Sequence, residues 1–269
     1  MPYIASPGRC IYCPGRPDSD EHIIPQSLGG RLVIENASCK DCRRVTSEFE
    51  RIVAREMYWP LRLTLGIKGS KKHKTERPTH WMGVLEDGDS IQDAPIEVGR
   101  FPAIYTVMEF APPGLLIGLP MHSGNPEMKL RLKASDTEIR ALCDDLGVGN
   151  LKVEHTLQWA PFARMIAKIC HAYAVSVVGL EGMRFYLPEL ILGTSGHLSH
   201  HVGGLSDPTH ELKPPHDLGL AIQTFNGAPH IVGRTTLFGA NRFPTYEAVV
   251  GEILDLDLIT RKISCAQQM

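Results

Sequence analysis

Several features that would point directly to a function are missing from this sequence of 269 residues. No apolar run approaches the ~18 residues needed to span a bilayer, and the N-terminus lacks the apolar segment of a secretory signal. There is no phosphate-binding loop of the G-x-x-x-x-G-K-S/T kind, no dinucleotide fingerprint and no internal repeat. Seven cysteines in a chain of this length do not indicate a disulfide scaffold. These absences predict a soluble, cytoplasmic protein with no membrane partner.

The net charge is −2, but the basic and acidic residues are distributed unevenly along the chain. Residues 1–80 carry 14 Lys+Arg and 9 Asp+Glu, a net of +5, whereas the remainder carries 14 basic and 21 acidic residues, a net of −7. The densest basic stretch is IKGSKKHKTERP, residues 67–78. Its Lys71, Lys72 and Lys74 are candidate contacts to nucleic-acid phosphates, and a solvated linker is the alternative interpretation.

The chain divides by pattern into a cysteine-containing segment over residues 1–60, a basic connector over 61–95 and a larger section over 96–269. The first segment predicts a strand at 21–24, a loop, a strand at 31–35 and a helix that begins near Asp41. Pro25 closes the first strand because proline cannot donate to a strand ladder. The sequence therefore predicts an α+β protein: a small finger followed by a mixed α+β domain of unknown topology.

The third section contains two clear helix signals and one clear hairpin signal. A capping box of Ser135 and Glu138 predicts a helix that ends at Gly147, and an apolar stripe predicts a second helix over 159–179. Strand-like runs lie at 102–110, 115–120, 218–225 and 228–238, and the last two are joined by a hairpin-forming Asn-Gly pair.

Four of the cysteines have the spacing of a zinc site. Cys10 and Cys13 form one Cys-x-x-Cys pair, and Cys39 and Cys42 form another 25 residues later. Two such pairs can surround one tetrahedral ion, and a closed four-thiolate site is structural because no position is open to substrate. The alternative is that one or both pairs are buried thiols without a metal.

Between the two pairs lies EHIIPQSLGG, residues 21–30, and here the chain resembles a known family. The pattern CIYC…EHIIPQSLGG…ENASCKDC resembles the HNH endonucleases, the ββα-metal nucleases, over residues 8–56. The resemblance implies hydrolysis of phosphodiester bonds in DNA, structural Zn²⁺, and Mg²⁺ or another divalent cation for catalysis. It implies nothing about residues 96–269.

The resemblance also implies roles for three residues. His22 corresponds to the general base, Glu21 to a ligand of the catalytic ion, and Asn36 to the residue that orients the histidine ring. Neighbouring strand residues point to opposite faces, so the Glu21–His22 step must lie at a strand end or in distorted backbone. Taken singly, the three residues are better interpreted as a surface acid, a strand residue and a turn residue. Taken together between the two cysteine pairs, they favour the catalytic interpretation.

The pattern departs from the family just after the last cysteine, where members commonly carry a second metal ligand. This chain has Arg43 there, and a guanidinium cannot bind a cation. Three interpretations remain open: Ser47 or Glu50 replaces the ligand, Arg43 itself provides positive charge to the phosphate, or the finger binds without cleaving. Arg44 is a candidate phosphate contact in each case.

The leading hypothesis is therefore a metal-dependent HNH-type DNA endonuclease. The alternative is a catalytically weakened nucleic-acid-binding zinc module with a C-terminal sensor or reader domain. A homodimer would suit double-strand cleavage, because one such finger cuts one strand at a time. The histidines of GTSGHLSHHVGG, residues 193–204, are interpreted as a solvent loop in preference to a metal site.

Overall fold

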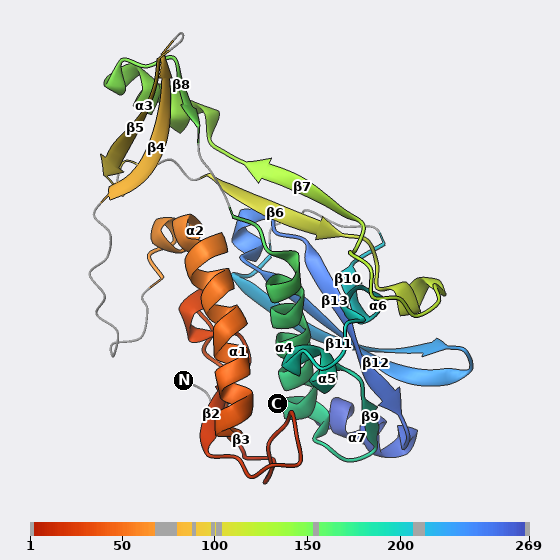
Figure 1. Ribbon diagram of the computed structural model, residues 1–269. Helices are drawn as coiled ribbons and strands as arrows, with labels where there is room; N and C mark the ends of the chain where they lie inside the picture. The colour runs from red at the N-terminus through yellow and green to blue at the C-terminus, as the bar shows by residue number, and fades with distance from the viewer. Residues whose placement is uncertain are drawn as a thin grey trace.

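The computed structural model describes residues 3–67, 80–87, 90–97, 100, 104–152, 156–206 and 213–266. It confirms a mixed α+β fold in which an N-terminal β-β-α finger precedes a larger mixed body (Figure 1). No helix within these ranges combines the length and the apolar character needed to cross a membrane.

The finger has the element order that the sequence predicts. Its three strands lie in the order β1-β3-β2, with β1 parallel and β2 antiparallel to β3. The helix α1 follows directly, and Cys39 is its N-cap residue. A π-helical turn, η2, and a short helix, α2, continue the chain. The bounds are β1 Tyr3–Ile4, β2 Ser19–His22, η1 Gln26–Leu28, β3 Val33–Ser38, α1 Lys40–Ile52, η2 Val53–Met57 and α2 Trp59–Thr64.

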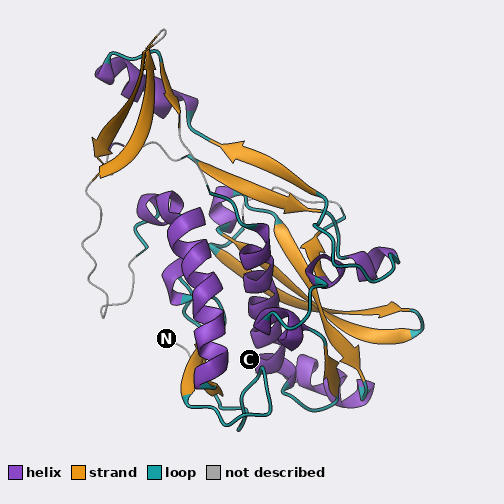
Figure 2. Ribbon diagram, viewed as in Figure 1, coloured by secondary structure: helices purple, strands orange, loops and turns teal. Residues whose placement is uncertain are grey.

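The helix α4, Trp159–Val178, lies between the finger and the main sheet (Figures 1 and 2). It contacts α1 of the finger and the strands β12 and β13 of the sheet. Most of its residues are buried, as expected for a helix that is apolar on nearly every side. The finger and the body consequently share one continuous hydrophobic core.

The main sheet has five strands in the order β10-β13-β12-β11, with β9 also paired to β13. Its partners are antiparallel throughout. The bounds are β9 Met183–Phe185, β10 Val202–Gly204, β11 His216–Phe225, β12 Ala228–Leu237 and β13 Thr245–Ile253. Short helical elements surround it: α5 Leu187–Leu192, α6 Leu198–His201, η5 Gly239–Asn241 and α7 Leu256–Ala266.

A smaller unit projects from the body and has a core of its own (Figure 1). Its sheet has the order β5-β4-β8, and one helix, α3, belongs to it. The two-stranded ribbon β6-β7 lies between this unit and the body (Figure 2). The bounds are β4 His80–Asp87, β5 Ser90–Glu97, β6 Tyr105–Phe110, η4 Gly114–Ile117, β7 Met128–Lys133, α3 Asp136–Leu146 and β8 Asn150–Lys152.

Two expectations from the sequence need correction. The connector over residues 61–95 contains the end of α2 and most of the β4-β5 hairpin. The strand-like run at 115–120 overlaps the 3₁₀ turn η4, because Pro113 and Gly118 bound a turn at that point. By contrast, the Ser135 cap, the Gly147 stop, the helix at 159–179 and the Asn226-Gly227 hairpin are confirmed.

Candidate active site

The four predicted zinc ligands come together at one end of the finger. The Sγ atoms of Cys10, Cys13, Cys39 and Cys42 all lie within 4.8 Å of one another. The Cys13 Sγ atom is 3.7 Å from that of Cys39 and 3.5 Å from that of Cys42. Thiolates on a tetrahedral zinc with ~2.3 Å bonds are ~3.8 Å apart, whereas a disulfide needs ~2.05 Å. The donor set therefore fits a four-thiolate zinc site.

Backbone N–H donors and a glycine beside the cysteines explain how the four sulfur atoms come together. The backbone N–H groups of Gly15 and Cys39 donate to the sulfurs of Cys13 and Cys10, at 3.4 Å each. A Cβ atom at Gly15 would lie only 3.1 Å from the Cys13 sulfur, so glycine leaves room for the ion's ligands. Burial and the neighbouring thiols raise the pKa of Cys42, and a bound cation is what would hold its thiolate form.

The Glu21–His22 step lies where the sequence requires it. His22 is the last residue of β2, and the pairing with β3 shifts register between Ser19 and Glu21. The two side chains differ in environment: Glu21 is 5% exposed, whereas His22 is half-buried. The following loop turns sharply, since a Cβ atom on Gly30 would lie 1.9 Å from the carbonyl oxygen of Ile24.

The surroundings of His22 lower the pKa of its imidazole and so favour the neutral form. Burial lowers its pKa below the ordinary value, the charge of Lys168 lowers it further, and Glu21 and Asp20 oppose the shift. Its Nδ1 atom is buried and has no hydrogen-bond partner among the described residues. With Nδ1 buried, Nε2 is the ring nitrogen left to accept a proton, as a neutral imidazole can.

Asn36 lies in β3 with its backbone in the left-handed region, at φ 42°. Its N–H donates to the Asp20 carboxylate at 3.1 Å, and its carbonyl accepts from the Ser6 hydroxyl at 3.1 Å. The Asn36 side chain is exposed and makes no hydrogen bond to the His22 ring. Its orienting role remains a prediction.

The structure brings Glu21 and Glu50 together, and it places a lysine from outside the finger between them. The Lys168 Nζ atom, on α4, lies 2.7 Å from Glu21 Oε1 and 3.0 Å from Glu50 Oε1. Burial alone lowers the pKa of Lys168, but attraction to the two carboxylates outweighs it and raises that pKa. Burial raises the pKa of Glu50, and the ammonium of Lys168 offsets part of that shift.

The arginines after the last cysteine are exposed on the first turn of α1. Arg43 forms an ion pair with Asp18 at 3.7 Å, with both side chains about half exposed. Arg44 and Ser47 are exposed on the same helix. Lys71, Lys72 and Lys74 lie outside the described residues.

Sequence reasoning missed Lys168. The one available signal is a single lysine in the middle of an otherwise apolar helix, RMIAKICHA, where a charge requires a buried partner. Nothing in the sequence indicates that the partners are Glu21 and Glu50, more than a hundred residues away.

A second link between α4 and the finger is buried His171. Its Nε2 atom donates to the carbonyl of Ile11 at 2.7 Å, and its ring packs against Tyr12 and Phe185. Burial lowers the pKa of His171 to about 4. The finger is therefore held to α4 at two places. His171 contacts the zinc-binding loop, and Lys168 contacts the hairpin.

We expect this histidine to make stability depend on pH. Below an unfolded pKa near ~6.5 the unfolded chain binds a proton at His171 that the folded chain does not, so stability is complete above that pH and declines below it. The decline is about 1.4 kcal/mol per pH unit. His171→Gln keeps a donor toward Ile11 and does not titrate. Urea unfolding at about pH 7 and about pH 5.5 should show wild type losing ~1.4 kcal/mol more than this variant, and equal losses would contradict the prediction.

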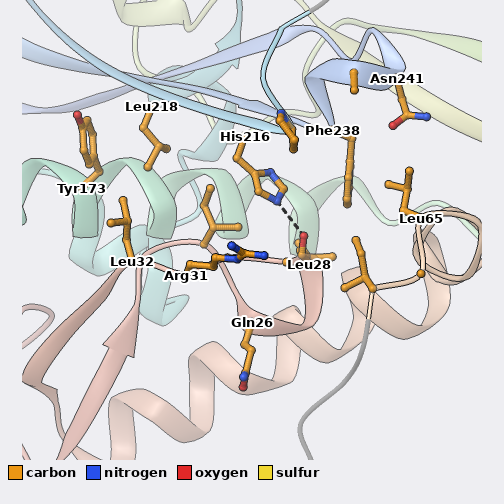
Figure 3. Close-up of a pocket in the computed structure, with 17 residues that line it drawn as sticks. Gln26, Leu28, Arg31, Leu32, Leu65, Tyr173, His216, Leu218, Phe238 and Asn241 are labelled. Carbon is orange, nitrogen blue, oxygen red and sulfur yellow. Dashed lines mark hydrogen bonds between the residues drawn. The ribbon is translucent and has the colours of Figure 1, made fainter. Parts of the chain in front are cut away.

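A pocket of about 1050 Å³ lies between the finger loop and the body, away from the cysteines (Figure 3). The His216 ring points from β11 toward the loop and its Nε2 atom donates to the Leu28 carbonyl at 2.9 Å. Arg31 and Gln26 add polar groups to walls that are largely apolar. His22 does not line this pocket, so it is separate from the candidate hydrolytic centre.

The solvent-loop interpretation of residues 193–204 is wrong for its last two histidines, because His200 and His201 are buried on the short helix α6. The His200 ring stacks edge-on against His201 and lies 6.3 Å from that of His122. In the part of the chain that the structure describes, the four cysteines are the only group of three or more candidate ligands close enough to share a metal ion.

Comparison with known proteins identifies the finger. Residues 10–51 match the family model described as HNH endonuclease, and this range contains the cysteine cage, Glu21, His22, Asn36 and Glu50. Searches of curated proteins and of solved structures returned no match. The match supports a nuclease-type function for the finger and a nucleic acid as its substrate.

Proposed function

We propose, from the premise that residues 10–51 are an HNH endonuclease finger, that this chain hydrolyses phosphodiester bonds in DNA with His22 as the general base. One observation carries the proposal. A half-exposed imidazole with a lowered pKa lies at the end of β2, on a hairpin beside a four-cysteine cluster. A positioned base with a pKa near or below neutrality is what activation of water requires.

The step assigned to His22 is a proton transfer. Its Nε2 atom takes a proton from water, and the water oxygen attacks phosphorus. The P–O bond opposite to it breaks, and the leaving alkoxide takes a proton from solvent water. For Nε2 to accept, Nδ1 carries the ring hydrogen, and Asn36 is the proposed residue that fixes this orientation. Zn²⁺ in the cysteine cage holds the hairpin and takes no part in the step.

Contacts to the DNA backbone are assigned to basic residues around the finger. Arg43 and Arg44 are exposed at the N-terminal end of α1, where backbone N–H groups also favour an anion. Lys71, Lys72 and Lys74 are further candidate phosphate contacts on the evidence of the sequence alone. Such contacts position the DNA without reading its sequence.

The test is a plasmid-nicking assay with purified, zinc-loaded protein in the presence of Mg²⁺, Mn²⁺ or Ni²⁺. The proposal predicts conversion of supercoiled plasmid to nicked circles, and to linear DNA where a homodimer acts on both strands. His22→Ala is the control for contaminating nucleases. Equal cleavage by the two proteins would overturn the proposal.

A second candidate is binding without cleavage, and the position of Glu21 favours it. Its carboxylate is buried against Lys168 and not directed to solvent, and Arg43 offers no ligand. This candidate predicts salt-sensitive retention of DNA with no His22-dependent scission. In that case, the pocket beside His216 becomes the candidate ligand site of a sensor or reader domain.

A further inference from the structure

Lys168 is surrounded by oxygen atoms of the finger. In addition to the carboxylates of Glu21 and Glu50, its ammonium group donates to the carbonyl of Ile23 at 3.3 Å and to the carbonyl of His22. Its side chain is fully buried. Four oxygens from two finger segments thus converge on one cation that comes from a different part of the chain.

This arrangement has the donor chemistry of a hard-cation site. Carboxylate and backbone carbonyl oxygens are the ligands that Mg²⁺, Mn²⁺ and Ca²⁺ take in proteins. The single ammonium of Lys168 lies within ion-pair distance of both carboxyl groups, so one positive charge faces two acidic side chains. A buried ammonium is stable here only because those oxygens replace its water.

The residues present do not fit the divalent ion that an HNH finger is expected to hold at its acid. The side chain after Cys42 is an arginine, which has no lone pair to offer. The space between Glu21 and Glu50 contains the Lys168 ammonium, 2.7 Å and 3.0 Å from their oxygens. A second cation at that distance would be repelled strongly in a buried environment.

We propose that the Lys168 ammonium is the resident cation of the Glu21–Glu50 pair and takes the place of a divalent ion. Shortening this one side chain then converts the oxygen cage into a divalent-cation site. The inference deepens the proposed function, on which it rests for the identity of the finger. The experiment measures metal binding and not cleavage. The inference can therefore fail while His22-dependent cleavage is confirmed, and cleavage can fail while the inference is confirmed.

The experiment is a Mn²⁺ titration of the full-length, zinc-loaded chain, followed by electron paramagnetic resonance of the free ion. Wild type should show no site that depends on Glu21 or Glu50. Lys168→Ala should bind one Mn²⁺ at least ~10-fold more tightly than wild type, because the repulsive charge is gone and the oxygens remain. Adding Glu50→Gln to Lys168→Ala should abolish the gain.

Lys262→Ala is the matched control. Lys262 also donates to α4, at the Val178 carbonyl at 2.7 Å, and its removal creates no pair of facing carboxylates. It should therefore gain no Mn²⁺ site. If Lys168→Ala unfolds without metal, recovery of its circular dichroism spectrum with Mn²⁺ counts as the gain, and absence of recovery counts against the proposal.

Two results would overturn the inference. One is stoichiometric Mn²⁺ binding by wild type that Glu21→Gln removes. The other is a folded Lys168→Ala protein that binds Mn²⁺ no better than wild type, which would make Lys168 a structural contact only.

Discussion

Chelation of zinc, or the substitution Cys42→Ser, is expected to unfold the finger and to lower the melting temperature of the whole chain. The four sulfurs converge within 4.8 Å at the base of a hairpin and a helix that are small by themselves. In such segments the binding free energy of zinc, about 10–16 kcal/mol, acts as folding free energy. Without the ion, the Cys10–Cys13 loop stays linked to the start of α1 and to its neighbours by only a few hydrogen bonds, such as that from the Ile11 N–H to the Ala37 carbonyl at 2.9 Å.

The loss should extend into the body, because the finger shares its core with α4. Lys168 and His171 both contact finger residues, and release of the finger would expose them. Hydrogen exchange should therefore show reduced protection in β2, β3, α1 and the facing side of α4. Calorimetry and elemental analysis measure the melting temperature and the zinc content of the same samples.

Cys265→Ser provides the control, since Cys265 is exposed on α7 and belongs to no cluster. It should leave one zinc per chain and an unchanged melting temperature. Purified wild type without zinc, together with an unaltered melting temperature for Cys42→Ser, would refute a structural metal.

Replacement of His22 by alanine is expected to reduce DNA cleavage by about 10²–10⁴-fold, the range for loss of a general base. The half-buried ring contributes little to the core, so zinc content and melting temperature should stay close to those of wild type. A variant that keeps the wild-type fold but loses cleavage activity shows that the replaced residue is catalytic and not structural.

His122→Ala is the matched control for this substitution. His122 is also half-buried, but it lies between η4 and β7, outside the residues that match the HNH family. It should cleave at the wild-type rate. A rate for His22→Ala within twofold of the control would argue against His22 as the base, since ~2-fold is far below the effect of a lost base.

Short-range sequence signals predicted most elements of the finger. Cysteine spacing, the Pro25 stop and the apolar stripe of residues 45–57 predicted its elements, because these depend on contacts within a short stretch of chain. The strand end or backbone irregularity at Glu21–His22 also followed from strand geometry alone, and the end of β2 at His22 and the register shift beside Glu21 confirm it. Beyond the finger, Ser135, Gly147 and Asn226-Gly227 predicted element ends for the same reason.

Long-range contacts account for what the sequence could not predict. The meeting of Lys168 with Glu21 and Glu50 depends on how α4 packs against α1. The pairing of β4 with β8 likewise joins residues more than sixty positions apart. The sequence of residues 61–95 alone therefore did not indicate that this segment contributes two strands to a sheet. Periodicity identifies a helix or a strand but does not specify its neighbour.

The most direct test of His22 as the base is chemical rescue of the cavity variant His22→Gly. Single-turnover cleavage of supercoiled plasmid should be lost in this variant and should return on addition of imidazole, in proportion to the neutral form of the added base. Cleavage by His22→Gly at the wild-type rate without imidazole, or wild-type protein that cuts no DNA, would contradict the account.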